Sequence, residues 1–141
     1  MAQLHSSKAT LRIAGDSLVP EVVSVALGHA PDKAQLKGQE FVGQTTGKIR
    51  VAKFGMWRLH APDAAPGDLD AQIKSILAKL TADLSVWRRL AANFEIDMFC
   101  GLFMQKENEG LTVSAESMAM LGERGIELSL DIYGGPEEDN A

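Results

Sequence analysis

The sequence predicts an α+β fold in which a single layer of mostly antiparallel sheet has helices packed on one face. The first observation behind this prediction is residues 94–104, the longest run of strict apolar alternation in the chain. The alternation places Cys100 on an apolar face, whereas Asp97 and Phe99 point to the opposite face. The second observation is that similar two-faced runs are interleaved with segments of helical periodicity. One helix layer can cover every apolar strand face, so the other face of the sheet is left to solvent or to a partner.

The length, charge and cysteine content of the chain restrict its class. A chain of 141 residues fits one domain, so we take residues 1–141 as a single domain, with residues 1–7 as a loose lead-in and residues 134–141 as a disordered acidic tail. The net charge of −5 argues against nucleic acid as a partner, because phosphate binding needs clustered Lys and Arg. The one cysteine cannot form an intrachain disulfide, and no apolar run is long enough to span a membrane. We therefore expect a cytoplasmic protein with no membrane partner.

The first part of the chain predicts two strands with a helix between them. Residues 8–14 alternate as a half-buried strand, with Arg12 on the polar face. A short helix follows, since Pro20 suits a first helical turn and Gly28 suits a helix end. Residues 31–39 predict a second, more exposed strand.

The middle of the chain predicts a long loop and then another two-faced strand. Residues 41–50 combine glycine and threonine with polar residues, and they predict a loop of a length that is often mobile or functional. Residues 51–60 then alternate, with Trp57 towards the core and Arg58 and His60 on the opposite face.

The clearest predicted element is one long helix over residues 69–91. Asp68 or Asp70 can cap its beginning, because an Asp carboxylate accepts hydrogen bonds from the free N–H groups of the first turn. Its apolar residues recur at spacings of three and four over about six turns, or roughly 35 Å. They are Leu69, Ile73, Ile76, Leu77, Leu80, Leu84, Trp87, Leu90 and Ala91. A stripe of this length is enough to cover a whole sheet.

The last part of the chain predicts a short strand, a helix and a final strand. Residues 111–113 can form the short strand, and Ser114 can cap a helix that runs to about Arg124. Residues 126–133 alternate again, with Asp131 among the residues on the polar face.

Four short segments spread along the chain carry a resemblance to a known family. In chain order they read ATLRIAGD at residues 9–16, GMWRL at 55–59, DMFCGLF at 97–103 and LSLDIY at 128–133. With these segments the sequence resembles the bacterial domain-of-unknown-function family 4279, and the match spans nearly the whole chain. The resemblance implies a bacterial, single-domain α+β protein. It carries over no activity, no cofactor and no catalytic residue.

The candidate functional site is the set of side chains on the polar faces of the predicted strands. Its members are Arg12, Arg58, His60, Asp97, Phe99, Asp131 and Tyr133. If the strands are neighbours, directly opposed side chains come within about 5 Å of each other. Two arginines in such a set can clamp an anion or a polar peptide through bidentate contacts. The alternative is a cross-strand charge ladder on a solvated face, worth about 0.2–1 kcal/mol per pair.

The same set allows a second chemistry, because His60 or a carboxylate of raised pKa can act in general acid–base catalysis. Other sites find no support in the sequence. Cys100 lies on the apolar face and has no histidine beside it in the predicted strand, so we expect an inert core residue. His5 and His29 lack the paired spacing of metal ligands. Residues 43–48 resemble a phosphate loop but are one residue short between the glycines.

We therefore predict a non-catalytic binding or protein-interaction module that uses the exposed face of its sheet. The expected partner is another protein or a small anionic or polar ligand, with no metal and no cofactor. Exposed aromatic side chains beside arginines are typical of contact surfaces, which favours this prediction. Two alternatives stay open: a small enzyme with acid–base residues on the same face, and a self-associating structural protein that buries this face in a homodimer.

Overall fold

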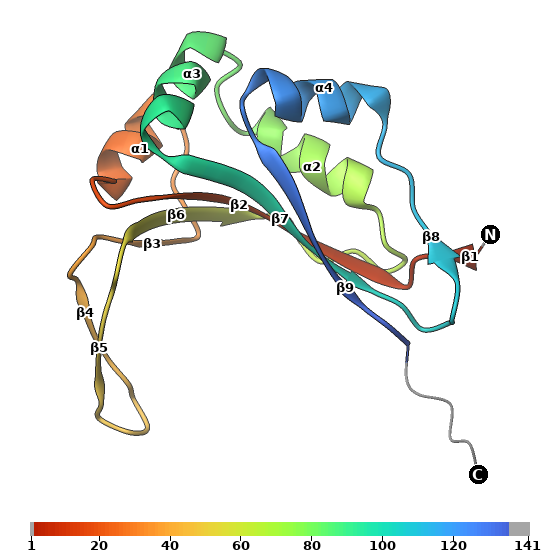
Figure 1. The fold of residues 1–141 in the computed structure, drawn as a ribbon, viewed down its shortest axis with the longest axis horizontal. Helices are drawn as coiled ribbons and strands as arrows, with labels where there is room; N and C mark the ends of the chain where they lie inside the picture. The colour runs from red at the N-terminus through yellow and green to blue at the C-terminus, as the bar shows by residue number, and fades with distance from the viewer. Residues whose placement is uncertain (1, 136–141) are drawn as a thin grey trace.

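The computed structural model describes residues 2–135 and confirms the α+β class (Figure 1). A five-stranded sheet has the strand order β3-β6-β2-β7-β9. Its strands are β3 (Lys33–Gln35), β6 (Gly55–His60), β2 (Ser6–Gly15), β7 (Glu95–Phe103) and β9 (Glu127–Tyr133). Neighbouring strands are antiparallel except β7 and β9, which are parallel. The sheet is therefore mostly antiparallel, as predicted.

The helices of the described chain lie together on one side of this sheet (Figure 1). They are α1 (Pro20–Leu27), α2 (Leu69–Ala78), α3 (Leu84–Asn93) and α4 (Ala115–Glu123). The apolar faces of the strands meet them, and Ile13, Trp57 and Met98 are fully buried in the shared core. Cys100 belongs to the same core, where it was predicted. On the opposite face of the sheet, called the outer face below, no helix of residues 2–135 lies (Figure 1).

Helix α1 begins and ends where the sequence predicts. Pro20 opens it, and Gly28 closes it at a φ of 78° with its N–H donating to the carbonyl oxygen of Ser24 at 2.8 Å. A φ in this left-handed region is open to glycine at little cost. The Ser24 hydroxyl also accepts a hydrogen bond of 3.0 Å from the indole of Trp57, which ties α1 to β6.

The predicted single helix over residues 69–91 is wrong, because the chain breaks it into α2 and α3. Asp68 caps α2, and Asp83 caps α3 by accepting a hydrogen bond of 2.9 Å from the Ser85 N–H. The break is held from both sides: the Thr81 N–H donates to Leu27 at 2.9 Å, and the Trp87 indole donates to the Thr81 carbonyl at 2.8 Å. Apolar spacing continues in phase across the break, so periodicity alone does not reveal it.

The predicted loop over residues 41–50 is instead a β-hairpin of β4 (Glu40–Val42) and β5 (Ile49–Val51). It projects from the sheet on the side away from the helices (Figure 1). Phe41 pairs with Arg50 across the hairpin, and the Arg50 guanidinium lies over the Phe41 ring at 4.7 Å from its centre. The glycines and polar residues that predict a loop form the turn, where Gly47 has a φ of 63°.

The beginning of the described chain and the strand expected at residues 111–113 differ from expectation. Residues 1–7 were expected to be loose, but β1 (Ala2–Gln3) pairs with β8 (Glu109–Gly110) and Leu4 is buried in the core. The short strand expected at residues 111–113 is absent, and β8 precedes it in the chain. The expected acidic tail, residues 134–141, lies outside the described residues from 136 onwards. Within residues 2–135, no helix is long and apolar enough to cross a membrane.

Candidate functional site

One row of charged side chains crosses all five strands of the outer face. The register places Arg12 of β2 opposite both Arg58 of β6 and Asp97 of β7. Lys33 of β3 lies opposite Arg58, and Glu127 of β9 lies opposite Asp97. The row is therefore cationic towards β3 and acidic towards β9. Three of the predicted site residues, Arg12, Arg58 and Asp97, are direct neighbours in it.

The centre of the row is a closed ion pair. The Arg12 guanidinium donates from Nε to Oδ1 of Asp97 at 2.8 Å and from Nη2 to Oδ2 at 2.5 Å. It also lies over the Phe99 ring, 4.3 Å from the ring centre. The hydrogen bonds to Asp97 raise the pKa of Arg12. Arg12, Asp97 and Phe99 thus form one preorganised unit in which the charges already satisfy each other.

The remaining predicted site residues form separate pairs away from this unit. His60 Nδ1 lies 3.2 Å from Oδ2 of Asp32, whose carboxylate also accepts the His60 backbone N–H at 2.9 Å. The Tyr133 hydroxyl donates to Asp131 at 2.6 Å, and this bond raises the pKa of Tyr133. The Tyr133 ring stacks on Phe103, with ring centres 4.8 Å apart. The structure therefore does not bring His60, Asp131 and Tyr133 together with Arg12.

Two hollows flank the outer face, and Phe54 and Met56 line both of them. The first, of about 520 Å³, includes the Arg12–Asp97 pair. The second, of about 440 Å³, lies between the sheet and the β4–β5 hairpin and is called the cationic hollow below. It is lined by Lys33, Ala34, Gln35, Phe41, Arg50, Phe54, Met56 and Arg58.

The cations of the cationic hollow lack acidic partners. Among residues 2–135, no carboxylate forms an ion pair with Lys33, Arg50 or Arg58. Arg58 instead points its Nε at the Met56 sulfur, 2.5 Å away. Since Arg58 lies directly opposite both Lys33 and Arg12, like charges face each other there, an arrangement that costs stability unless an anion offsets it.

Lys33, Arg50, Phe41 and Phe54 were missed by sequence reasoning, although one signal marks them. Residues 33–58 hold six of the fourteen Lys and Arg residues but one acidic residue, Glu40. This segment carries a net charge of +5, and the remainder of the chain carries −10. The overall charge of −5 hides this separation.

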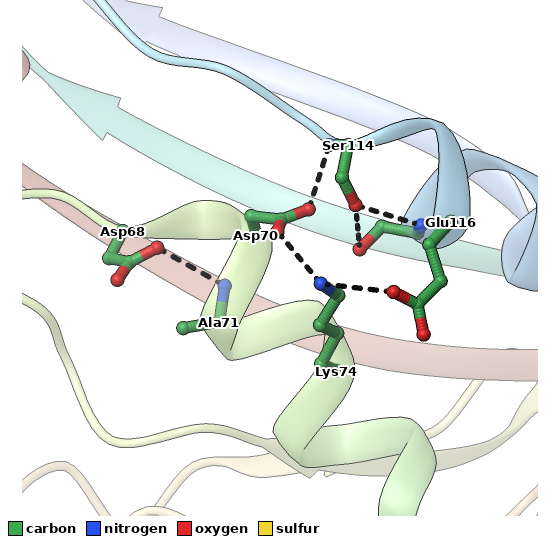
Figure 2. A network of polar contacts seen from close by, with 7 residues as sticks. Asp68, Asp70, Ala71, Lys74, Ser114 and Glu116 are labelled. Carbon is green, nitrogen blue, oxygen red and sulfur yellow. Dashed lines mark hydrogen bonds and ion pairs between the residues drawn. The ribbon is translucent and has the colours of Figure 1, made fainter.

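A second polar cluster joins α2 to the beginning of α4 (Figure 2). Asp70 accepts a hydrogen bond of 2.8 Å from the Ser114 N–H and lies 3.3 Å from the Lys74 ammonium, which also reaches Glu116 at 3.5 Å. Hydrogen bonds from Ser117 and Ser114 hold the pKa of Asp70 far below its ordinary value. Because these polar groups pair with one another, the cluster is a structural link between α2 and α4.

The remaining reactive side chains offer no site. Cys100 is fully buried, its thiol donates to the Met98 carbonyl at 3.5 Å, and burial raises its pKa to about 12. A thiol of this kind does not supply the thiolate that nucleophilic chemistry needs. Within the described part of the chain, no three His, Cys, Asp or Glu side chains are arranged to hold a metal ion.

Comparison with known proteins adds a family. A family model described as a domain of unknown function (DUF4279) matches residues 4–135, almost the full length described. No curated protein and no solved structure matches the chain.

Proposed function

The chain belongs to the DUF4279 family, and we propose that it is a non-catalytic binding module that uses the outer face of its sheet to hold an acidic segment of a partner protein. The observation that carries the proposal is the cationic hollow, in which Arg58 and Lys33 face each other with no carboxylate between them. A carboxylate from a partner offsets this repulsion and gains charge-assisted hydrogen bonds from Arg58.

The hollow combines charge with apolar surface, which suits a peptide segment. Phe54 is 40% exposed at the boundary of the two hollows, and Met56 forms the floor beside it. A side chain next to the bound carboxylate can pack on these two residues. The Arg50 guanidinium, held over the Phe41 ring, supplies a second cation from the hairpin side. The site therefore matches an acidic residue beside an aromatic or aliphatic one.

The hairpin extends the same surface beyond the hollow. Val42 and Ile49 pair across it and are 66% and 62% exposed. Exposed aliphatic pairs next to arginines are typical of protein contact surfaces. The net charge of +5 on residues 33–58 also steers an acidic partner towards this end of an otherwise acidic molecule.

The ion pair at the centre of the outer face has a supporting role in this proposal. Asp97 binds the Arg12 guanidinium, so the partner meets Arg58, which has no ion pair within the described residues. The pairs His60–Asp32 and Tyr133–Asp131 leave their carboxylates occupied as well. Recognition then centres on Arg58, Lys33 and Arg50.

The test is a titration followed by two-dimensional NMR, which suits a protein of 15.2 kDa. The probe is a capped synthetic peptide of alternating Glu and Tyr, and its control is the same peptide with Gln in place of Glu. We expect shifts on β3, β5 and β6 with the Glu peptide alone. Replacing Arg58→Ala should weaken binding about 10- to 100-fold, since a hydrogen bond to a charged group is worth about 1.5–3 kcal/mol.

Arg88→Ala is the matched control, because Arg88 is an exposed arginine of α3 on the helix side. It should leave the affinity unchanged. Equal binding of the Glu and Gln peptides, or shifts confined to the helix layer, would overturn the proposal. Binding of citrate without binding of either peptide would show that the ligand is a small organic anion and not a segment of a protein.

A further inference from the structure

Strand β9 is an open edge of the five-stranded sheet. It follows β7 in the strand order and has no described strand on its other side. All of its seven residues pair with β7 in one continuous parallel register, from Asp97 opposite Glu127 to Phe103 opposite Tyr133. Half of the backbone N–H and C=O groups of β9 therefore point away from the sheet.

The apolar side of β9 is also uncovered. Leu128, Leu130 and Ile132 lie opposite core residues of β7, so they share the helix-facing side of the sheet. Their β7 partners are at most 4% exposed, whereas these three are 38%, 48% and 60% exposed. The helix layer covers β7 and stops short of the edge. An aliphatic row on a sheet edge is a surface that water solvates poorly.

Strand β9 lacks most of the features that protect an edge from pairing, and its two charged residues, Glu127 and Asp131, lie on the outer face. Natural edge strands are usually short, bulged or interrupted by Lys or Pro. The opposite edge, β3, follows that rule with three residues that begin at Lys33. In contrast, β9 has the sequence ELSLDIY, without Lys, Arg or Pro, and its register with β7 contains no bulge.

The hydrogen bonds to β7 fix which residues of β9 face outwards. The Tyr133 carbonyl accepts the Met104 N–H at 3.0 Å, so the backbone groups of Tyr133 point towards β7. Successive residues of a strand alternate in this direction. The free edge therefore presents the backbone groups of Leu128, Leu130 and Ile132, the same residues that carry the exposed aliphatic side chains.

We propose that β9 pairs antiparallel with β9 of a second copy of this chain, with Leu130 on the two-fold axis. In this register Leu130 pairs with itself and Leu128 pairs with Ile132, so every outward N–H and C=O finds a partner. On the outer face, Glu127 meets Tyr133 and Ser129 meets Asp131. No like charges lie opposite each other, and the aliphatic row becomes continuous across the axis.

The neighbouring registers are worse for electrostatic reasons. A shift that puts Ser129 on the axis sets Glu127 opposite Asp131, and a shift that puts Asp131 on the axis sets it opposite itself. Carboxylates directly opposed across two strands destabilise the pairing. A shift by an odd number of residues places the apolar side chains of one β9 on the same face of the joined sheet as the polar side chains of the other β9. The register centred on Leu130 thus avoids the carboxylate clashes of the registers beside it, and it is also the register that pairs all seven residues of β9.

The dimer leaves the proposed binding surface free. The cationic hollow lies at β3 and β6, the opposite end of the sheet from β9. The two copies would form one continuous sheet with a cationic hollow at each far end. The inference rests on β9 alone and does not require the proposed function.

Solution mass gives the first test, measured by light scattering after size-exclusion chromatography. We expect the native protein to have twice the chain mass of 15.2 kDa. Leu130→Glu should have the mass of a single chain, because it places two carboxylates opposite each other on the axis. Val25→Glu is the matched control, because Val25 is an 84% exposed aliphatic residue of α1, and it should remain dimeric. Circular dichroism and thermal unfolding should show both variants folded.

Cysteine cross-linking under mild oxidation tests the register. A hydrogen-bonded antiparallel pair has Cα atoms about 5.5 Å apart, within reach of a disulfide. Leu130→Cys should therefore cross-link faster than Ser129→Cys or Asp131→Cys, and the native chain is the background because Cys100 is buried. A monomeric native mass, or fastest cross-linking through position 129 or 131, would overturn the proposal.

Discussion

Arg12 is a candidate binding residue in the sequence, but in the fold its guanidinium forms a structural ion pair with Asp97. The two hydrogen bonds of this pair occupy one edge of the Arg12 guanidinium, and the Phe99 ring covers one face. Asp97 is also largely covered, with 17% of its side chain exposed. An arginine held in this way is poorly placed to bind a partner. Arg58 is therefore the better candidate on the outer face, because its guanidinium forms no ion pair with any residue between 2 and 135.

Asp70 carries the prediction at the residue scale. Its pKa is lowered from 3.8, so the folded state favours the charged form more than the unfolded chain does. The stabilisation is therefore complete above pH 3.8 and is lost as the pH falls below that value. Replacing Asp70→Asn should lower the free energy of unfolding at neutral pH by about 1–2 kcal/mol.

Urea denaturation at a series of pH values measures this difference. We expect the gap between the native protein and Asp70→Asn to narrow as the solution becomes more acidic, because the native carboxylate is then protonated too. Asp63→Asn is the control, since the Asp63 side chain is 67% exposed and pairs with Lys8, whose side chain is 57% exposed. A gap that stays constant with pH would show that Asp70 acts through packing rather than charge.

At the scale of single elements, the residues at the helix ends set where α2 and α3 are separated. The break between α2 and α3 depends on the Asp83 cap and on the hydrogen bonds of Thr81 to Leu27 and Trp87. Each of the two helices is ten residues long, so each can follow the twisted sheet separately. One straight helix of the predicted length has no such freedom.

Two glycine substitutions, one at the end of α1 and one inside α4, have opposite expected effects on stability. Gly28→Ala places a Cβ at a φ of 78°, and it should lower the free energy of unfolding by about 1–2 kcal/mol. Gly122→Ala lies inside α4, where an added Cβ meets nothing within 4 Å. It should raise stability by roughly 0.5–1 kcal/mol, because alanine favours the helix. Both values follow from urea denaturation, and equal effects of one sign would contradict this account.

At the scale of the whole molecule, the hairpin is separable from the core. None of the buried core residues comes from β4 or β5. Backbone hydrogen bonds also join the two ends of the hairpin. The Ala52 N–H donates to the Gln39 carbonyl at 2.9 Å, and the Gly38 N–H donates to the Ala52 carbonyl at 2.8 Å. Changes to the β4–β5 hairpin should therefore have little effect on the free energy of unfolding.

Replacement of residues 40–51 by a two-residue Gly-Gly turn tests this separation. The free energy of unfolding should change by no more than about 2 kcal/mol, because a roughly sixfold change in loop length alters the closure entropy by about 1.6 kcal/mol. Binding of the Glu-containing peptide should be lost, since Arg50 and Phe41 are removed. Thermal unfolding and the NMR titration measure the two effects. Loss of folding would show that the hairpin supports the sheet, contrary to this prediction.

Much of the fold was accessible from local patterns. Strand alternation placed Trp57 and Cys100 in the core, and turn chemistry placed the end of α1 at Gly28. The hairpin was mistaken for a loop because its strands are short and its residues are exposed, so neither a buried face nor a long alternation marks it. The outward direction of Arg12, Arg58 and Asp97 was likewise predictable from alternation.

The sequence by itself determined which residues face the core and which face outwards, because side-chain direction in a strand or helix is a local property of the backbone. The tertiary structure decided which outward residues meet. Strand order joined Arg12 to Asp97 and left Arg58 beside Lys33, and it left β9 at an edge with its aliphatic row uncovered. Strand order depends on the packing of distant segments, and no local periodicity encodes it.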